Sequence, residues 1–168
     1  MAFIHMQDWR VSAAVLIFVA SSGAPCLPAT AADRLENLGL MTGTCERLVI
    51  DGKNLTGDCA GKIIQSIYDD GRTGWYMMIG DKGAVVTLSG MSGAKPDADS
   101  QLQDLDSVIW GGAAKGAPAK TETITGQCLY SNPNNGPTSI TCIAKNQTGD
   151  VSVLEFRTDG KPPEFMKK

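Results

Sequence analysis

From residue 42 onward the chain consists of short runs rich in Val, Ile, Thr and aromatic residues, interrupted by Gly, Asp or Asn about every ten residues. Runs of this length are typical of β-strands, and residues that tolerate a positive φ are typical of tight hairpin turns. The clearest turn signals are Asp51-Gly52, Asp70-Gly71, Asp81-Lys82-Gly83, Asn135-Gly136 and Gly149-Asp150. The pattern predicts an all-β fold in which successive strands are mostly joined as a meander of hairpins.

About eight antiparallel strands are expected. They cover residues 42–50, 55–68, 73–80, 83–89, 101–110, 121–131, 137–146 and 151–158. A set of this size must protect its edges, either by closing fully or partly into a barrel or by stacking as a β-sandwich. We expect the barrel and keep the sandwich as the alternative. Helical spacing is confined to Asp33–Gly39, where Leu35 and Leu38 predict one or two helical turns before Gly39.

Residues 1–31 are predicted to be a removable signal peptide. Arg10 precedes the apolar run Val11–Ala20, which is shorter than the roughly 20 residues that span a membrane, and Ala29-Thr30-Ala31 fits a cleavage site. Residues 32–168 are then a single β-rich domain with a short N-terminal segment, 32–41. We expect an exported protein, periplasmic or secreted, with no transmembrane anchor after processing.

Processing at this site removes Cys26 and leaves Cys45, Cys59, Cys128 and Cys142. An even set of cysteines in an exported chain predicts two disulfides, because oxidising compartments allow such bonds to persist. The two pairs have the same spacing and each brackets a polar turn. We therefore expect disulfides between Cys45 and Cys59 and between Cys128 and Cys142, each joining opposed residues of a hairpin.

The cysteine pairs also share their surroundings. Thr42-Gly-Thr-Cys45 and Thr125-Gly-Gln-Cys128 both read T-G-x-C, and Lys62 and Lys145 follow at the same distance. The pattern suggests an internal duplication, with a chance match as the open alternative because the repeat is short.

The only histidine, His5, lies in the predicted signal peptide. A mature chain without imidazole excludes Ser-His-Asp triads, Cys-His dyads, histidine-ligated zinc and histidine bases. The net charge of −3, with its charges scattered, offers no basic surface for nucleic acid. We therefore expect a non-catalytic protein, without a cofactor or metal, that binds a partner protein or a small envelope ligand.

The densest carboxylate cluster consists of Asp97, Asp99, Asp104 and Asp106. Calcium takes oxygen ligands of this kind, but the spacing lacks the Gly and Glu of an EF-hand, so a solvated loop and strand face is favoured. Because two carboxylates suffice for glycoside hydrolysis, a carboxylate-dependent glycan hydrolase is one alternative function. Carriage of a small apolar ligand inside a closed barrel is another.

Two loops rich in Gly, Ala, Pro and Lys, residues 90–100 and 111–120, flank the strand that ends in Trp110. Trp110 and Lys115 are our candidate partner-binding residues, because an aromatic side chain beside a flexible loop can anchor a partner protein. The alternative for Trp110 is a partly buried strand end.

Ser92-Gly-Ala-Lys95 and the segment from Trp110 to Lys115-Gly116 resemble the S-G-x-x-Y and W-x-x-K-G elements of the bacterial inhibitors of c-type lysozyme, which are small exported barrels. Pro96 stands where that family has tyrosine, and Trp110 is farther from Lys115 than the family's spacing. The resemblance covers a small minority of the chain. It implies one form that a binding protein could take, an inhibitor of an extracytoplasmic hydrolase.

Overall fold

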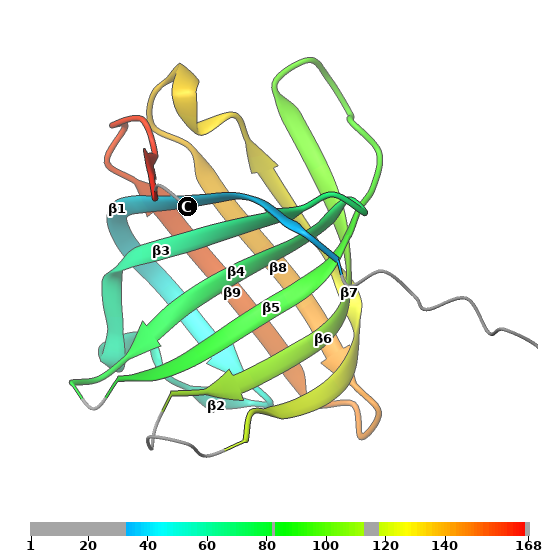
Figure 1. Cartoon of the computed structure of the whole chain (residues 1–168). Helices are drawn as coiled ribbons and strands as arrows, with labels where there is room; N and C mark the ends of the chain where they lie inside the picture. Colours follow the sequence, from blue (N-terminus) through cyan, green and yellow to red (C-terminus); the bar gives the residue numbers. More distant parts are fainter. Residues whose placement is uncertain (1–32, 82, 113–117, 167–168) are drawn as a thin grey trace, which may run out of the picture. The chain divides into compact units, whose positions relative to one another are not determined.

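Eight antiparallel strands close into a barrel in the computed structural model, which describes residues 33–81, 83–112 and 118–166 (Figure 1). The barrel strands are β1 (Leu35–Ile50), β3 (Cys59–Tyr68), β4 (Arg72–Ile79), β5 (Ala84–Ser92), β6 (Ser100–Gly111), β7 (Lys120–Ser131), β8 (Ser139–Asn146) and β9 (Val151–Thr158). Two short strands, β2 (Lys53–Asn54) and β10 (Glu164–Phe165), pair with β1. Short 3₁₀ turns occur at Thr56–Asp58 (η1) and Pro133–Asn135 (η2).

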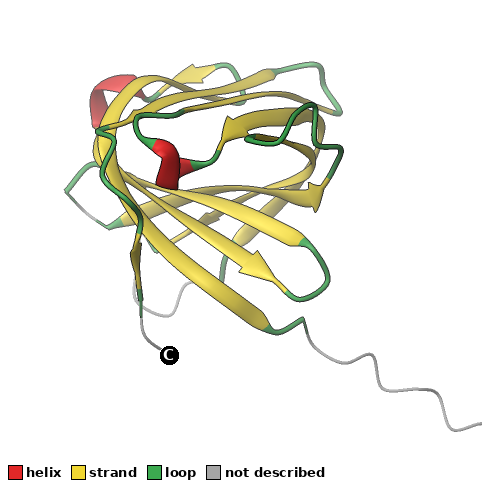
Figure 2. Ribbon diagram, turned by 90° about the horizontal axis from the view of Figure 1, so that it is seen from above, coloured by secondary structure: helices red, strands yellow, loops and turns green. Residues whose placement is uncertain are grey.

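The barrel strands follow one another as a meander, and β1 closes the ring. The first half of β1 pairs with β3 as far as Thr42↔Lys62, and the second half pairs with β9 from Gly43↔Thr158 onward. Figure 2 shows the strands surrounding the interior when the molecule is viewed from above. The predicted all-β class and the barrel are confirmed, and the sandwich alternative is excluded.

The segment before residue 42 was expected to include a helical turn, and this expectation is wrong. Residues from Leu35 onward are part of β1, with Leu38 opposite Ser66 and Leu40 opposite Ile64. The edge of β3 offers backbone partners along this whole stretch, and such pairing outweighs the local helical spacing of two leucines.

Both predicted disulfides are present. Cys128 and Cys142 are direct register partners, as expected for a hairpin crosslink. Cys45 and Cys59 are not ladder partners, because β1 has already left β3 and Cys45 lies opposite Phe156 of β9. The first disulfide therefore joins two strands at the point where they separate.

The T-G-x-C segments occupy similar positions in the barrel. Thr42 lies opposite Lys62, and Thr125 lies opposite Lys145. A Cβ atom added at Gly43 or Gly126 would lie 2.1 Å from a backbone carbonyl oxygen of the neighbouring strand. Each glycine is thus required by a close approach of two backbones.

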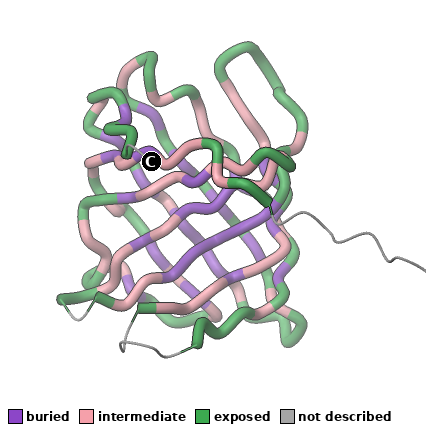
Figure 3. Tube along the Cα trace, viewed as in Figure 1, coloured by how far each residue is buried: buried purple, intermediate pink, exposed green. Residues whose placement is uncertain are grey.

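The core fills the middle of the barrel, where purple marks buried residues in Figure 3. Inward side chains such as Trp75, Phe156, Leu48, Leu88 and Leu154 are at most 1% exposed. The β3–β4, β5–β6 and β7–β8 turns lie at one end of the barrel, with the latter two at the top of Figure 1, and the β4–β5 and β8–β9 turns lie at the other. We call the first end the mouth.

Among the described residues, no helix has the length and apolar character needed to span a membrane. The two disulfides fit an oxidising, extracytoplasmic location.

Candidate functional site

Trp110 lies near the end of β6, opposite Val86 and Lys120, at the end of the barrel away from the mouth. Its half-buried ring packs against the hydrophobic core. This is the position of a partly buried strand end, the alternative that the sequence left open. Lys115, the second predicted partner-binding residue, lies outside the described residues.

The two long loops that flank β6 are separated by the length of that strand. Residues 93–99 precede β6 at the mouth, whereas β6 ends at Gly111 at the opposite end (Figure 1). A strand of this length spans about 35–40 Å, so one small ligand cannot contact both ends of β6.

The four aspartates of the acidic cluster do not form one site. Asp106 accepts two hydrogen bonds from the Arg72 guanidinium, at 3.0 and 2.9 Å, and these bonds lower the pKa of the Asp106 carboxyl. Asp104 accepts a hydrogen bond of 2.8 Å from Gln127. Both carboxylates are thus engaged with side chains of other strands, Asp106 with β4, which is two strands away, and Asp104 with the neighbouring β7.

Asp97 and Asp99 belong to the loop between β5 and β6. The backbone N–H of Asp99 donates to the Asp97 carboxylate and is the main cause of the lowered pKa of Asp97. Asp99 in turn accepts a hydrogen bond of 2.7 Å from the Asn135 side chain. Across residues 33–81, 83–112 and 118–166, no group of three or more metal-binding side chains comes together.

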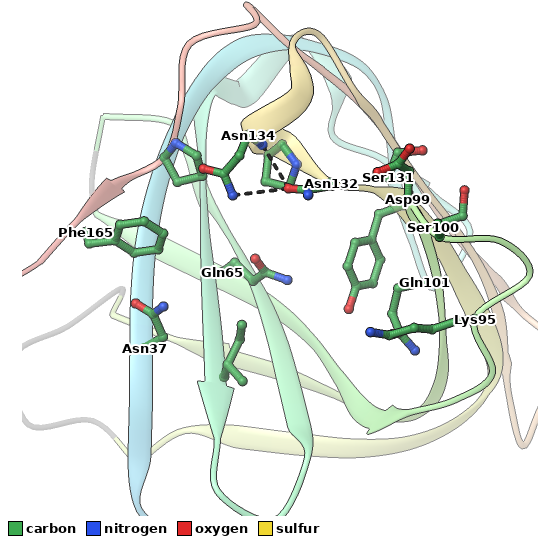
Figure 4. Close-up of a pocket in the computed structure, with 15 residues that line it drawn as sticks. Asn37, Gln65, Lys95, Asp99, Ser100, Gln101, Ser131, Asn132, Asn134 and Phe165 are labelled. Carbon is green, nitrogen blue, oxygen red and sulfur yellow. Dashed lines mark hydrogen bonds between the residues drawn. The ribbon is translucent and has the colours of Figure 1, made fainter.

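A pocket of about 310 Å³ opens at the mouth of the barrel (Figure 4). Amide side chains dominate its polar lining: Asn37, Gln65, Gln101, Asn132 and Asn134. The lining also includes one ammonium group, Lys95, one carboxylate, Asp99, and the apolar residues Ile67, Pro163 and Phe165. The residues come from β1, β3, β6, β7 and β10 and from the loops between strands.

One wall of the pocket is a row across three strands. Gln65 of β3 lies opposite Gly39 of β1, and Gly39 lies opposite Phe165 of β10. A Cβ atom at Gly39 would approach both the Phe165 ring and Pro163 at 3.3 Å, so the ring covers the bare backbone of this glycine. The ring therefore takes the place that a side chain at Gly39 would occupy, and Figure 4 shows the Gln65 amide and the Phe165 ring standing apart along this wall.

Tyr130 forms the floor of the pocket and rests on a buried polar network. Tyr130 contacts Trp75 edge to face, with ring centroids 4.9 Å apart. The Trp75 indole donates to Gln103 at 2.8 Å, and the Gln103 amide donates to the Thr73 carbonyl oxygen at 2.7 Å. Burial raises the pKa of the Tyr130 hydroxyl, against a smaller opposite effect of its hydrogen bond with Thr73. A satisfied network of this kind holds the floor in one arrangement.

The rim of the pocket joins two loops by hydrogen bonds. The Asn132 backbone N–H donates to the Asp99 carbonyl oxygen at 2.7 Å, and the Asn132 side-chain oxygen accepts from the backbone and side chain of Asn134. The Gln101 amide donates to the Gly93 carbonyl oxygen at 2.8 Å. The Asn132–Asp99 bond connects the β5–β6 loop to the β7–β8 loop, and the other bonds hold each loop in its own conformation.

Three polar groups of the pocket remain available to a ligand. The side chains of Asn37, Gln65 and Lys95 make no hydrogen bond or ion pair with any other residue that the structure describes. Because Asp99 supplies the one carboxylate of this lining, the pocket does not offer the two carboxylates that glycoside hydrolysis uses. The arrangement is suited to binding.

Sequence reasoning missed this pocket, although a signal was present. Gln65, Gln101 and Gln103 stand at inward positions of strands whose other inward residues are mostly apolar. A polar side chain on an apolar face indicates either a buried network or a pocket; here Gln103 belongs to the network, and Gln65 and Gln101 line the pocket.

No protein-family model, curated protein or solved structure matches the chain. The geometry alone thus defines the class described here, a disulfide-linked, eight-stranded antiparallel barrel with a polar pocket at one mouth.

Proposed function

We propose that this chain is an exported, non-catalytic binding protein that holds a small polar ligand at the mouth of its barrel. The observation that carries the proposal is the pocket of about 310 Å³, in which uncommitted amide groups face an open space above a rigid floor. Small-molecule sites are usually preformed concave pockets with a few convergent polar groups. The mouth pocket has these properties.

Export is part of the proposal. The two disulfides support it, because such bonds persist outside the reducing cytosol. The order of Arg10, the apolar run and Ala29-Thr30-Ala31 supports a signal peptide with the mature chain starting at Ala32. N-terminal sequencing of the exported protein should give a start within a few residues of Ala32, and an unprocessed N-terminus would contradict this part of the proposal.

The fold favours a ligand at the mouth over an apolar ligand inside the barrel. The interior between the two ends is filled by large buried side chains, including Trp75, Met77 and Phe156. On the outer wall, the Asp106 carboxylate is bound to Arg72 and the Asp104 carboxylate to Gln127, so they give no support to a glycan hydrolase. Trp110 packs on the core, which weakens the case for a partner protein anchored on its ring.

The test is amide chemical-shift mapping with a set of small polar compounds: neutral saccharides, amino acids and dicarboxylates. We expect at least one compound to bind with a Kd in the millimolar range or tighter and to shift residues of the mouth. Shifts confined to the opposite end, or no shift with any compound, would contradict the proposal.

A matched pair of variants makes the test specific. Gln65→Leu removes an amide that faces the pocket, whereas Gln127→Leu removes an exposed amide of the outer wall. Binding should weaken in the first variant and stay unchanged in the second. Equal binding by both variants would place the ligand outside the pocket.

A further inference from the structure

We infer that the ligand of the mouth pocket is a neutral saccharide of one or two rings, with one sugar face stacked on Phe165 and hydroxyl groups bound by the neighbouring amides. This inference rests on the proposed function and specifies its ligand class. It is carried by the row formed by Gln65, Gly39 and Phe165 and by the chemistry of the groups around it.

The row has the dimensions that a sugar ring needs. Neighbouring strands lie about 4.8 Å apart, so the backbones of Gln65 and Phe165, two strands apart, are separated by roughly 10 Å. Gly39 has no side chain, and the Phe165 ring lies over its backbone, so the ring presents a face beside Gln65. A flat ring about 4 Å from the Phe165 face would therefore place its edge within hydrogen-bond reach of the Gln65 amide.

The exposed face of the Phe165 ring is accessible for stacking against one face of a sugar ring. Phe165 is 55% exposed although its ring lies over the Gly39 backbone. The C–H groups of a sugar face are apolar and slightly positive, and the face of an aromatic ring is slightly negative, so the two surfaces attract each other. An exposed phenylalanine beside free amides thus provides one apolar and one polar contact for the same ring.

Two of the three uncommitted polar groups, the amides of Asn37 and Gln65, match hydroxyls better than they match ions, whereas the Lys95 ammonium only donates. An amide side chain both donates and accepts hydrogen bonds, and so does a hydroxyl group, whereas a phosphate or carboxylate only accepts. Asn37 and Gln65 supply two such amides. A purely apolar ligand would leave them without partners, at a cost in binding free energy.

The charges of the pocket favour a neutral ligand. Lys95 is the cation and Asp99 the anion of the described lining, so the two formal charges cancel. A pocket built for an anion would instead carry an excess of positive charge. The pocket volume lies at the lower limit of small-molecule sites, which fits one or two sugar rings.

The test uses maltose and N,N′-diacetylchitobiose as neutral saccharides, glucose 6-phosphate and succinate as anions, and glycylglycine as a zwitterion. Binding is followed by amide shifts and by Trp75 fluorescence in a Trp110→Phe variant, in which Trp75 is the remaining tryptophan of residues 32–168. We expect at least one neutral saccharide to bind and to shift Gly39, Gln65 and Phe165.

Three substitutions at the row test the stacking. Phe165→Leu should weaken saccharide binding by about 3- to 10-fold, because it removes the aromatic face and keeps the bulk. Phe165→Tyr should bind within about twofold of the parent, because it keeps that face. Gly39→Ala should weaken binding because the added methyl group displaces the Phe165 ring from its position over the Gly39 backbone. Unchanged unfolding temperatures of the Phe165 variants serve as the folding control.

The outcomes separate the inference from the proposal beneath it. If only the anions or the dipeptide bind at the mouth, the saccharide class is overturned and the mouth-binding proposal stands. If no probe shifts the mouth residues, both are overturned. If a saccharide binds the Phe165→Leu and Phe165→Tyr variants equally well, the inferred stacking is overturned.

Discussion

Gln103 is the residue whose replacement tests the floor of the pocket most directly. Its side chain is fully buried, accepts a hydrogen bond from the Trp75 indole and donates one to the Thr73 carbonyl oxygen. Gln103→Met keeps nearly the same shape and removes both contacts, together with a longer one of 3.4 Å to the Gly90 carbonyl oxygen. The indole N–H is then buried without an acceptor, because Trp75 is 1% exposed and water cannot replace the lost partner.

The magnitude follows from these two contacts. A buried donor left without a partner costs about 1–3 kcal/mol, and the lost bond to the carbonyl oxygen adds about 1 kcal/mol. We therefore expect the free energy of unfolding to fall by about 2–4 kcal/mol. For a domain of about 140 residues this corresponds to a decrease in Tm of roughly 10 °C.

Urea unfolding followed by circular dichroism measures the change, with Gln127→Met on the outer wall as the control. A double-mutant cycle with Trp75→Phe isolates the hydrogen bond, because the orphaned N–H is absent from the double variant. The second substitution should cost about 1–2 kcal/mol less in the Gln103→Met background than in the parent. A loss no larger than that of Gln127→Met, or an additive cycle, would refute the reasoning.

Three further results are expected. Replacing Cys128 and Cys142 together with Ala should lower the free energy of unfolding by about 3 kcal/mol in urea titrations, because the closed loop of about 15 residues no longer restricts the unfolded chain. Gly126→Ala should lower the free energy of unfolding by more than about 3 kcal/mol or prevent folding, since its Cβ would overlap the Ile143 carbonyl oxygen. The control Gly57→Ala has open space at its Cβ and should change that free energy by less than about 1 kcal/mol. Comparable effects of the two substitutions would contradict the close approach of the two backbones at Gly126. Hydrogen bonds from the Thr42 hydroxyl and the Lys161 backbone lower the pKa of Asp159 to about 2, so its stabilising contribution is complete above about pH 4 and is lost as the pH falls toward 2. Urea midpoints measured across this pH range should decline less steeply for Asp159→Asn, and equal slopes would show that the carboxylate contributes nothing.

The barrel could be predicted because its signals are local. Asp51 and Gly52 have φ values of 51° and 74°, the left-handed turn that their residue types indicate. The crosslink between Cys128 and Cys142 joins direct register partners, as equal spacing around a polar turn suggests. The start of β1 was not predictable from its own residues, because its extended form depends on hydrogen bonds to β3.

The pocket could be predicted only in part. Gln65 is visible in the sequence as a polar residue in an apolar strand, but nothing local shows that it shares a row with Phe165. The pairing of β10 with β1 involves two residues on each strand, Gly39 with Phe165 and Leu40 with Glu164, and a contact this short leaves no periodic pattern. A pocket assembled from five strands becomes apparent only in the closed barrel.

The division of β1 between two neighbours also sets an order of assembly. Val49, near the end of β1, pairs with Val153, so the first barrel strand to emerge during synthesis is completed by the last barrel strand, β9. Until β9 is available, half of β1 presents unpaired backbone groups to other chains, which invites edge-to-edge association. A chain shortened before Val151 would leave the second half of β1 without its β9 partner. We expect it to aggregate under conditions in which the full-length chain does not.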